Sequence, residues 1–237
     1  MFLGCKFYKL NPRVESDTKK LLLSKNKVFT YKKEARLDKE EELCFYIEKI
    51  LGAPELGNLI TFYYDELIYV RQLDKESKRF KKKEVRITHG PIRAFVFEKV
   101  PLDGYLAVLS NKYIASRVEN ILRGVLNLKG IKERHPLLPI IVDIKKKEQE
   151  IRNIPDFEEV TEFLVDKIRD YYVDWAWLRG SMLDQSEEYE RYIIDEFTSG
   201  QVRLLAVSYR KRVYYLYNDG RIFTKQASDV TSDAHLI

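Results

Sequence analysis

Cysteine, histidine, methionine and tryptophan are scarce in this chain of 237 residues, which holds two, three, two and two of them respectively. Cys5 and Cys44 lie far apart, form no CxxC pair and have no histidine nearby in the sequence. This pattern argues against a zinc site or a redox pair. We interpret both as small buried hydrophobic residues and expect no cofactor.

The three histidines leave few groups for acid–base catalysis near neutral pH. His89, His135 and His235 fall in segments with turn signals or in the polar tail. A metal-free ribonuclease that pairs His89 with Lys83 or a tyrosine stays open, but no spacing requires it. The chain also lacks GxGxxG, Walker, GxSxG and HExxH motifs, which removes the commonest nucleotide-binding and hydrolase fingerprints. We therefore expect a protein that is not an enzyme.

Long apolar runs are missing as well. No window approaches the ~18 uninterrupted apolar residues that a membrane span requires, although apolar residues make up 45% of the chain. The apolar patch near the N-terminus is too short for a secretory signal, and no small-residue cleavage site follows it. We expect a cytoplasmic protein with no membrane partner.

Lysine, glutamate, tyrosine and isoleucine are abundant, and charged residues make up 33% of the chain. This composition resembles that of proteins from hyperthermophiles, in which surface ion-pair networks are favoured. Arguments from charge are weakened by this likeness, because such proteins carry basic runs for stability as well as for partners.

The charge is unevenly distributed along the chain. Residues 1–137 hold 28 Lys/Arg and 18 Asp/Glu, a net charge of +10, whereas residues 138–237 hold 14 and 19, a net charge of −5. His135-Pro136 and Pro139 restrict the backbone between these halves. We expect two small domains, a basic one at 1–137 and an acidic one at 138–237, and an anionic partner would meet the first.

Both domains are expected to have an α+β fold. In the basic domain the patterns predict a helix at 38–51, a hairpin turning at Asp65-Glu66, a second hairpin around Asp103-Gly104, and a helix at 111–126 capped by Ser110. In the acidic domain they predict the order β-α-β-α-β-β-β. Its segments are a strand at 137–147, a helix at 156–168, a strand at 171–181, a helix at 184–197 and an antiparallel C-terminal meander at 202–209, 212–217 and 221–225.

The densest basic run is KESKRFKKKEVR, residues 75–86. It supplies six candidate phosphate contacts: Lys78, Arg79, Lys81, Lys82, Lys83 and Arg86. Each phosphate that such a cluster neutralises releases counterions and adds about 0.9 to the salt slope on duplex DNA. A second cationic segment covers residues 19–33. The alternative interpretation is a solvated loop.

The last hairpin, SYRKRVYYLYNDGRIFTK, places cations beside aromatic rings. Arg210, Lys211, Arg212 and Tyr214 have the chemistry to bind phosphates and stack bases. Tyrosine is also an ordinary strand residue, so the simpler interpretation is a structural hairpin. Trp175 and Trp177 share one face of their strand, and we expect that face to be buried in the core.

Three functions follow from these patterns. The leading one is non-catalytic nucleic-acid binding, DNA or RNA, through Lys/Arg phosphate contacts and aromatic stacking. The first alternative is an interaction or assembly module, with a protein partner or a second copy, in which the basic and acidic halves pair. The second is a metal-dependent nuclease around Asp143 and Lys145, because an acidic-x-Lys arrangement on a strand suits Mg²⁺ chemistry when a further carboxylate is near.

Overall fold

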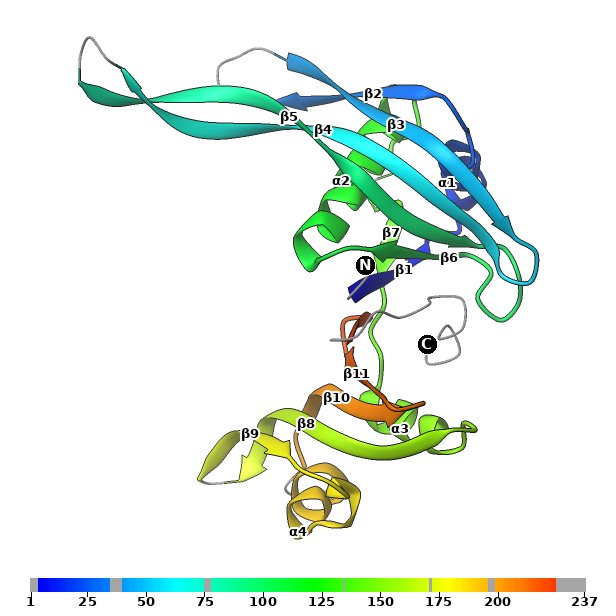
Figure 1. Ribbon diagram of the computed structural model, residues 1–237, viewed down its shortest axis with the longest axis vertical. Helices are drawn as coiled ribbons and strands as arrows, with labels where there is room; N and C mark the ends of the chain where they lie inside the picture. Colours follow the sequence, from blue (N-terminus) through cyan, green and yellow to red (C-terminus); the bar gives the residue numbers. More distant parts are fainter. Residues whose placement is uncertain are drawn as a thin grey trace. The chain divides into compact units, whose positions relative to one another are not determined.

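The computed structural model describes residues 4–34, 40–74, 78–133, 135–170, 172–195 and 199–224 (Figure 1). Over these residues the chain forms twelve β-strands, and far fewer residues lie in helices. The strand pairs described below are antiparallel. The expected balanced α+β class is therefore wrong. Two segments expected as helices are long strands instead.

The chain divides into two compact units. The arm unit consists of Leu10–Val108 and Ser116–Leu137, and the pocket unit of Met1–Lys9, Leu109–Ala115 and Leu138–Ile237. Both units are discontinuous in sequence. The division after residue 137 into a basic and an acidic domain stays a prediction.

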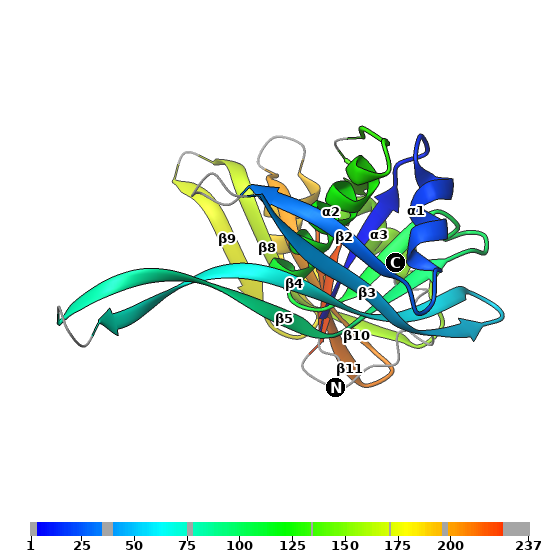
Figure 2. The ribbon, with the colours of Figure 1, turned by 90° about the horizontal axis from the view of Figure 1, so that it is seen from above.

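The arm unit is a curved sheet with helices on one face (Figures 1 and 2). Its strand order is β2-β3-β4-β5-β6. Phe45, Phe62 and Phe95 from the sheet and Val118 and Leu122 from the long helix are buried. The elements are α1 (Glu15–Leu22), β2 (Val28–Glu34), β3 (Glu40–Ala53), β4 (Gly57–Asp74), β5 (Arg79–Phe97), β6 (Tyr105–Leu109) and most of α2 (Lys112–Leu128).

The segment expected as a helix at 38–51 is strand β3, and its first two residues lie outside the described residues. Leu43, Phe45 and Ile47 alternate on the buried face, as the two-residue period of a strand requires. The strand pairs with β2 on one side and β4 on the other. In these two ladders the backbone N–H and C=O groups of β3 pair with the neighbouring strands rather than within a helix.

The turn expected at Asp65-Glu66 is also wrong, because β4 continues through both residues to Asp74. Both carboxylates are buried, and both have partners inside the unit. The turn expected at Asp103-Gly104 is present between β5 and β6, with Gly104 in the left-handed region at φ +80°. Helix α2 is present as expected, but Asn111 rather than Ser110 caps it, its Oδ1 accepting from the Ile114 N–H at 3.0 Å.

The pocket unit is built on antiparallel strands in the order β1-β12-β11-β10-β8-β9. Its core gathers Ile144, Ile151, Phe163, Val165 and Leu205. The elements are most of β1 (Gly4–Leu10) and β7 (Leu137–Pro139), then α3 (Ile144–Arg152), β8 (Phe157–Asp170), β9 (Val173–Arg179), η1 (Leu183–Gln185), α4 (Glu187–Tyr189), η2 (Glu190–Ile194), β10 (Gln201–Tyr209), β11 (Arg212–Tyr217) and β12 (Arg221–Thr224).

Two expectations for this unit are wrong and two are confirmed. The segment expected as a strand around Asp143 becomes helix α3, which Asp143 caps, and the segment expected as a helix at 156–168 is strand β8. The strand β9 and the C-terminal meander β10-β11-β12 are present as expected. The helix expected at 184–197 is broken into short turns over 183–194, with Ser186 as a cap, and residues 196 and 197 lie outside the described residues.

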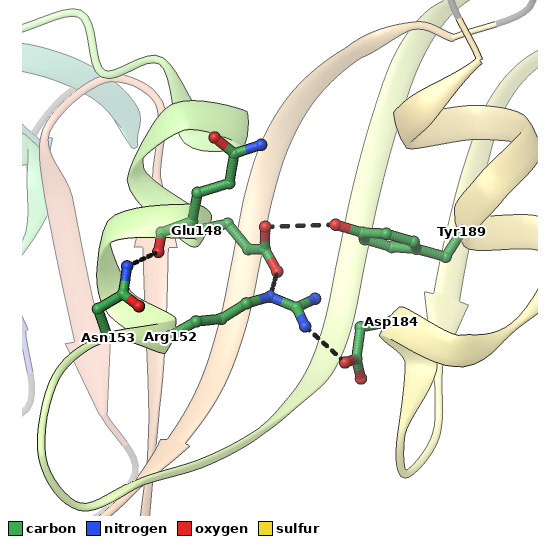
Figure 3. A network of polar contacts seen from close by, with 6 residues as sticks. Glu148, Arg152, Asn153, Asp184 and Tyr189 are labelled. Atoms are coloured by element: carbon green, nitrogen blue, oxygen red, sulfur yellow. Dashed lines mark hydrogen bonds and ion pairs between the residues drawn. The ribbon is translucent and has the colours of Figure 1, made fainter.

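A polar network holds α3 against the short helical segment (Figure 3). Buried Glu148 accepts a hydrogen bond from the Tyr189 hydroxyl at 3.2 Å and pairs with Arg152, whose Nη1 reaches Asp184 at 2.7 Å. Burial and the nearby Glu148 carboxylate raise the pKa of Tyr189 to about 12. The network therefore holds α3 at Glu148, in its middle, and at Arg152, its last residue.

Candidate nucleic-acid interface

The most prominent feature of the arm unit is a two-stranded ribbon. Over the described residues, β3 pairs with β4 no further than Phe45 opposite Tyr64, whereas β4 and β5 stay paired as far as Asp74 opposite Arg79. We call residues 68–74 and 79–85 the arm. Figures 1 and 2 show these strands extending away from the other strands of their unit. Seven residue pairs at about 3.3 Å per residue give the arm a length of roughly 23 Å.

The arm concentrates the positive charge that the sequence predicts as an interface. Residues 67–86 carry eight Lys/Arg and three Asp/Glu, a net charge of +5 that equals the net charge of the whole chain. All six predicted phosphate contacts of this run are exposed. They are Lys78, Arg79, Lys81, Lys82, Lys83 and Arg86, the last of which lies at the base of the arm and donates to the Glu42 carbonyl at 2.8 Å.

Both faces of the arm are cationic. Because side chains alternate along a strand, Arg79, Lys81 and Lys83 share one face, while Arg71 and Lys82 share the other and lie directly opposite each other. Like charges in this position destabilise a pair of strands. Lys82 and Lys83 form no ion pair with a carboxylate of the described residues. Both faces of the ribbon are therefore positively charged at its surface.

Apolar side chains are exposed on the same arm. Tyr69, Leu73 and Phe80 are 47%, 51% and 70% exposed. Leu73 and Phe80 lie opposite each other near the end of the arm, on the face that carries Arg71 and Lys82. An isolated two-stranded ribbon has no second layer in which to bury such residues. These side chains therefore belong to the exposed surface of the arm rather than to a core.

The base of the arm is anchored by two buried carboxylates on adjacent residues of β4. They point to opposite faces of the strand. Asp65 accepts from the Thr88 hydroxyl at 2.7 Å and the Cys44 N–H at 3.2 Å, while Glu66 meets Arg117 Nη2 at 2.8 Å and His89 Nε2 at 3.1 Å.

Tyr31 adds a third tie at the base of the arm. Its hydroxyl donates to the Asp65 carbonyl, and burial together with the neighbouring Asp65 carboxylate raises the pKa of Tyr31. The arm thus leaves a rigid base, in which β4 is tied to β2, β3, β5 and α2.

The last hairpin is expected to supply a stacking surface. Tyr214 is 2% exposed and its ring lies 6.3 Å from that of Tyr209, so the ring packs inside the unit, and its stacking role stays a prediction. Arg210 and Lys211 form the turn with φ of 47° and 60°. Arg210 lies over the Tyr209 ring and pairs with Asp156 at 2.9 Å. Arg212 is half-buried, so over residues 208–224 the exposed cations of this hairpin are Arg210 and Lys211.

The structure places the predicted nuclease residues at the start of a helix rather than on a strand. Asp143 caps α3, its Oδ1 accepting from the Lys145 and Lys146 N–H groups at 3.1 and 3.3 Å. The expected strand arrangement of Asp143 and Lys145 is therefore wrong. Among the described residues, no cluster of His, Cys, Asp and Glu could hold a metal ion.

Sequence reasoning missed Arg71, Tyr69, Leu73 and Phe80 as parts of the interface, because it placed the turn too early. The available signal was the alternation of apolar and polar residues, which continues through LIYVRQLD and resumes in RFKKKEV. These two segments lie on either side of the polar KESK. Glu66 and Arg117 are 51 positions apart, and nothing local in the sequence links them.

Comparison of the chain with protein-family models, curated proteins and solved structures found no match. None of the helices in the described ranges is long and apolar enough to cross a membrane.

Proposed function

We propose that this protein binds nucleic acid without catalysing a reaction, and that the β4–β5 arm is its contact surface. The observation that carries the proposal is the like-charge pair of Arg71 and Lys82 on a ribbon that is cationic on both faces. The repulsion between these two cations is offset when phosphates lie on either side of the ribbon.

The shape of the arm favours duplex DNA. The major groove of B-DNA admits a two-stranded β-ribbon and is walled by phosphates on both sides. The major groove of an RNA duplex is too deep and narrow for side chains to read. A ribbon roughly 23 Å long, with cations on both faces, therefore suits the DNA groove better than the RNA groove.

The test is fluorescence anisotropy with labelled duplex DNA, single-stranded DNA and duplex RNA at about 50 and 200 mM salt. Charge reversal of Lys81, Lys82 and Lys83 to Glu should weaken duplex DNA binding by more than about tenfold and lower the salt slope by about 2.7, which is 0.9 for each lost phosphate contact. The matched control reverses Lys49, Lys99 and Lys132, three exposed lysines of the same unit outside the arm. Equal losses in both variants would show only an effect of net charge and would overturn the proposal.

A second candidate function is assembly with another copy of the chain. Trp175 and Trp177, expected in the core, are 62% and 60% exposed on β9, the last strand in the sheet of the pocket unit. Exposed tryptophans beside the open edge of a sheet are typical of an interface.

Sedimentation velocity separates the two forms of this assembly. Replacement of both tryptophans by serine should dissociate an edge-to-edge dimer, whereas Tyr172→Ser, at a more exposed aromatic residue outside the strand, should not. An oligomer that dissociates with salt would instead indicate pairing of the basic and acidic halves. A monomer under all conditions rules out assembly.

The cytoplasm remains the proposed location. Cys5 and Cys44 are free cysteines, as is usual where thiols are kept reduced.

A further inference from the structure

The pocket unit contains a cavity of about 830 Å³, within the size range of small-molecule sites. Its wall comes from the segment before α3, the start of α3, the end of β8 and the start of β10. The lining residues are Ile141, Val142, Asp143, Ile144, Lys145, Lys167, Arg169, Ser199, Gly200, Gln201 and Val202.

Three cations line this cavity, of which Lys145 is half-buried and Lys167 and Arg169 are exposed. Lys145 comes from α3, and Lys167 and Arg169 from β8. Over the described residues, none of the three forms an ion pair with a carboxylate. The one carboxylate among the lining residues belongs to Asp143, which is occupied in capping α3. Counted over the described lining residues, the wall therefore has a surplus of two positive charges.

The backbone beside the cavity departs from regular strand geometry at the end of β8. Between Asp166 and Asp170 the pairing of β8 with β9 is interrupted, and Lys167 adopts a left-handed φ of 53°. Bulges of this kind re-aim side chains and are common beside binding sites. Gly200 makes the close approach of β10 possible, because a Cβ there would lie 2.3 Å from the Asp166 carbonyl oxygen.

The electrostatics of the cavity point in the same direction. Burial, together with the positive charge of Arg169, lowers the pKa of Lys145, although Asp143 opposes the shift. Like charges held beside one another raise the free energy of the site, and an anion bound among them lowers it. The network of Glu148, Arg152, Asp184 and Tyr189 fixes α3 and hence the position of Lys145 (Figure 3).

We propose that this pocket binds a phosphate ester of a small organic molecule with at least two negative charges. Three cations match a phosphate or diphosphate group. Val142, Ile144 and Val202 give the wall an apolar part that suits the organic portion. None of the residues that line the pocket lies in the arm. A lack of phosphate-ester binding and a lack of nucleic-acid binding would therefore be separate results.

Isothermal titration calorimetry of the full chain tests the proposal. The probes are ADP, ribose 5-phosphate, inorganic phosphate, unphosphorylated adenosine and a 5′-phosphorylated oligonucleotide. ADP or ribose 5-phosphate should bind more tightly than inorganic phosphate, and adenosine should not bind. The variant with Lys81, Lys82 and Lys83 reversed should keep this affinity, because those residues do not line the cavity.

A matched pair of variants checks the location. Lys145→Ala should weaken binding of ADP by about tenfold or more, since a hydrogen bond to a charged group contributes about 1.5–3 kcal/mol. Lys146→Ala changes the next residue of α3, which is exposed and does not line the cavity, and should leave affinity unchanged. The Lys167→Ala, Arg169→Ala double variant lies on another element and should abolish binding with an unchanged unfolding midpoint. The proposal is overturned by equal losses in Lys145→Ala and Lys146→Ala, by no binding of either ester, or by binding of the oligonucleotide alone.

Discussion

Arg71 and Lys82 lie directly opposite each other across β4 and β5, on the same face of an exposed ribbon. Two cations in this position repel, and the cost is a fraction of a kilocalorie per mole up to about 1 kcal/mol. The arm is less stable with this pair than it would be with oppositely charged residues at the two positions.

This pair gives the first prediction, in which stability and binding move in opposite directions. Lys82→Glu turns a repulsive cross-strand pair into an attractive one and should raise the free energy of unfolding by about 0.2–1 kcal/mol. The same change should weaken duplex DNA binding severalfold. Urea unfolding and anisotropy measure the two effects. If Lys82→Glu leaves binding as tight as in the wild type, the arm is not the contact surface.

Phe80 allows the apolar part of the arm to be tested separately. It is 70% exposed, so Phe80→Ala should change the free energy of unfolding by no more than about 0.5 kcal/mol, unlike a core substitution. If the ring contacts bases or sugars, affinity for duplex DNA should fall while the salt slope stays constant, because no phosphate contact is lost. Val100→Ala, at a more exposed apolar residue outside the arm, is the control. A reduced salt slope for Phe80→Ala would contradict this assignment.

Glu66 should matter for folding rather than for contact with a partner. Its buried carboxylate lies between Arg117 and His89 and ties β4 to α2. Glu66→Gln removes the charge that the Arg117 guanidinium meets, and we expect a loss of about 1.5–3 kcal/mol in the free energy of unfolding. Glu55→Gln, at an exposed residue of the same unit, should have no measurable effect. Urea unfolding of the two variants decides the matter, and similar values for both would remove the anchoring role.

The charge on the arm could be predicted from the sequence, but its geometry could not. The run from Lys78 to Lys83 is visible as a local feature. The turn is expected at Asp65-Glu66 because two β-rich runs meet there, whereas in the structure Glu66 pairs with Arg117 and Asp65 accepts a hydrogen bond from the Thr88 hydroxyl. Only long-range contacts reveal that these two residues belong to a continuous strand.

The same limit explains the wrong helix at 38–51. Leu43, Ile47 and Ile50 follow a helical spacing, while Leu43, Phe45 and Ile47 follow the spacing of a strand, so the local pattern fits both structures. Pairing with β2 and β4 decides between them. By contrast, the meander β10-β11-β12 was predicted correctly, because Asn218-Asp219-Gly220 is a strong local turn signal.

Tyr189 gives a prediction about alkaline pH. Burial and Glu148 raise its pKa to about 12 in the folded protein, whereas a tyrosine in an unfolded chain titrates near about 10. The folded state therefore holds this proton more tightly. The contribution to stability is fully present below about pH 10 and is lost as the pH rises towards 12.

Tyr189→Phe keeps the ring against Phe163 but removes the titrating hydroxyl. The variant should be less stable than the wild type at neutral pH, because Glu148 loses a hydrogen bond. Between about pH 9 and 11.5 its free energy of unfolding should fall less steeply than that of the wild type. Tyr172→Phe, at an exposed tyrosine, should reproduce the wild-type slope. Parallel slopes for Tyr189→Phe and the wild type would mean that the hydroxyl of Tyr189 titrates normally and that the network in Figure 3 does not hold its proton.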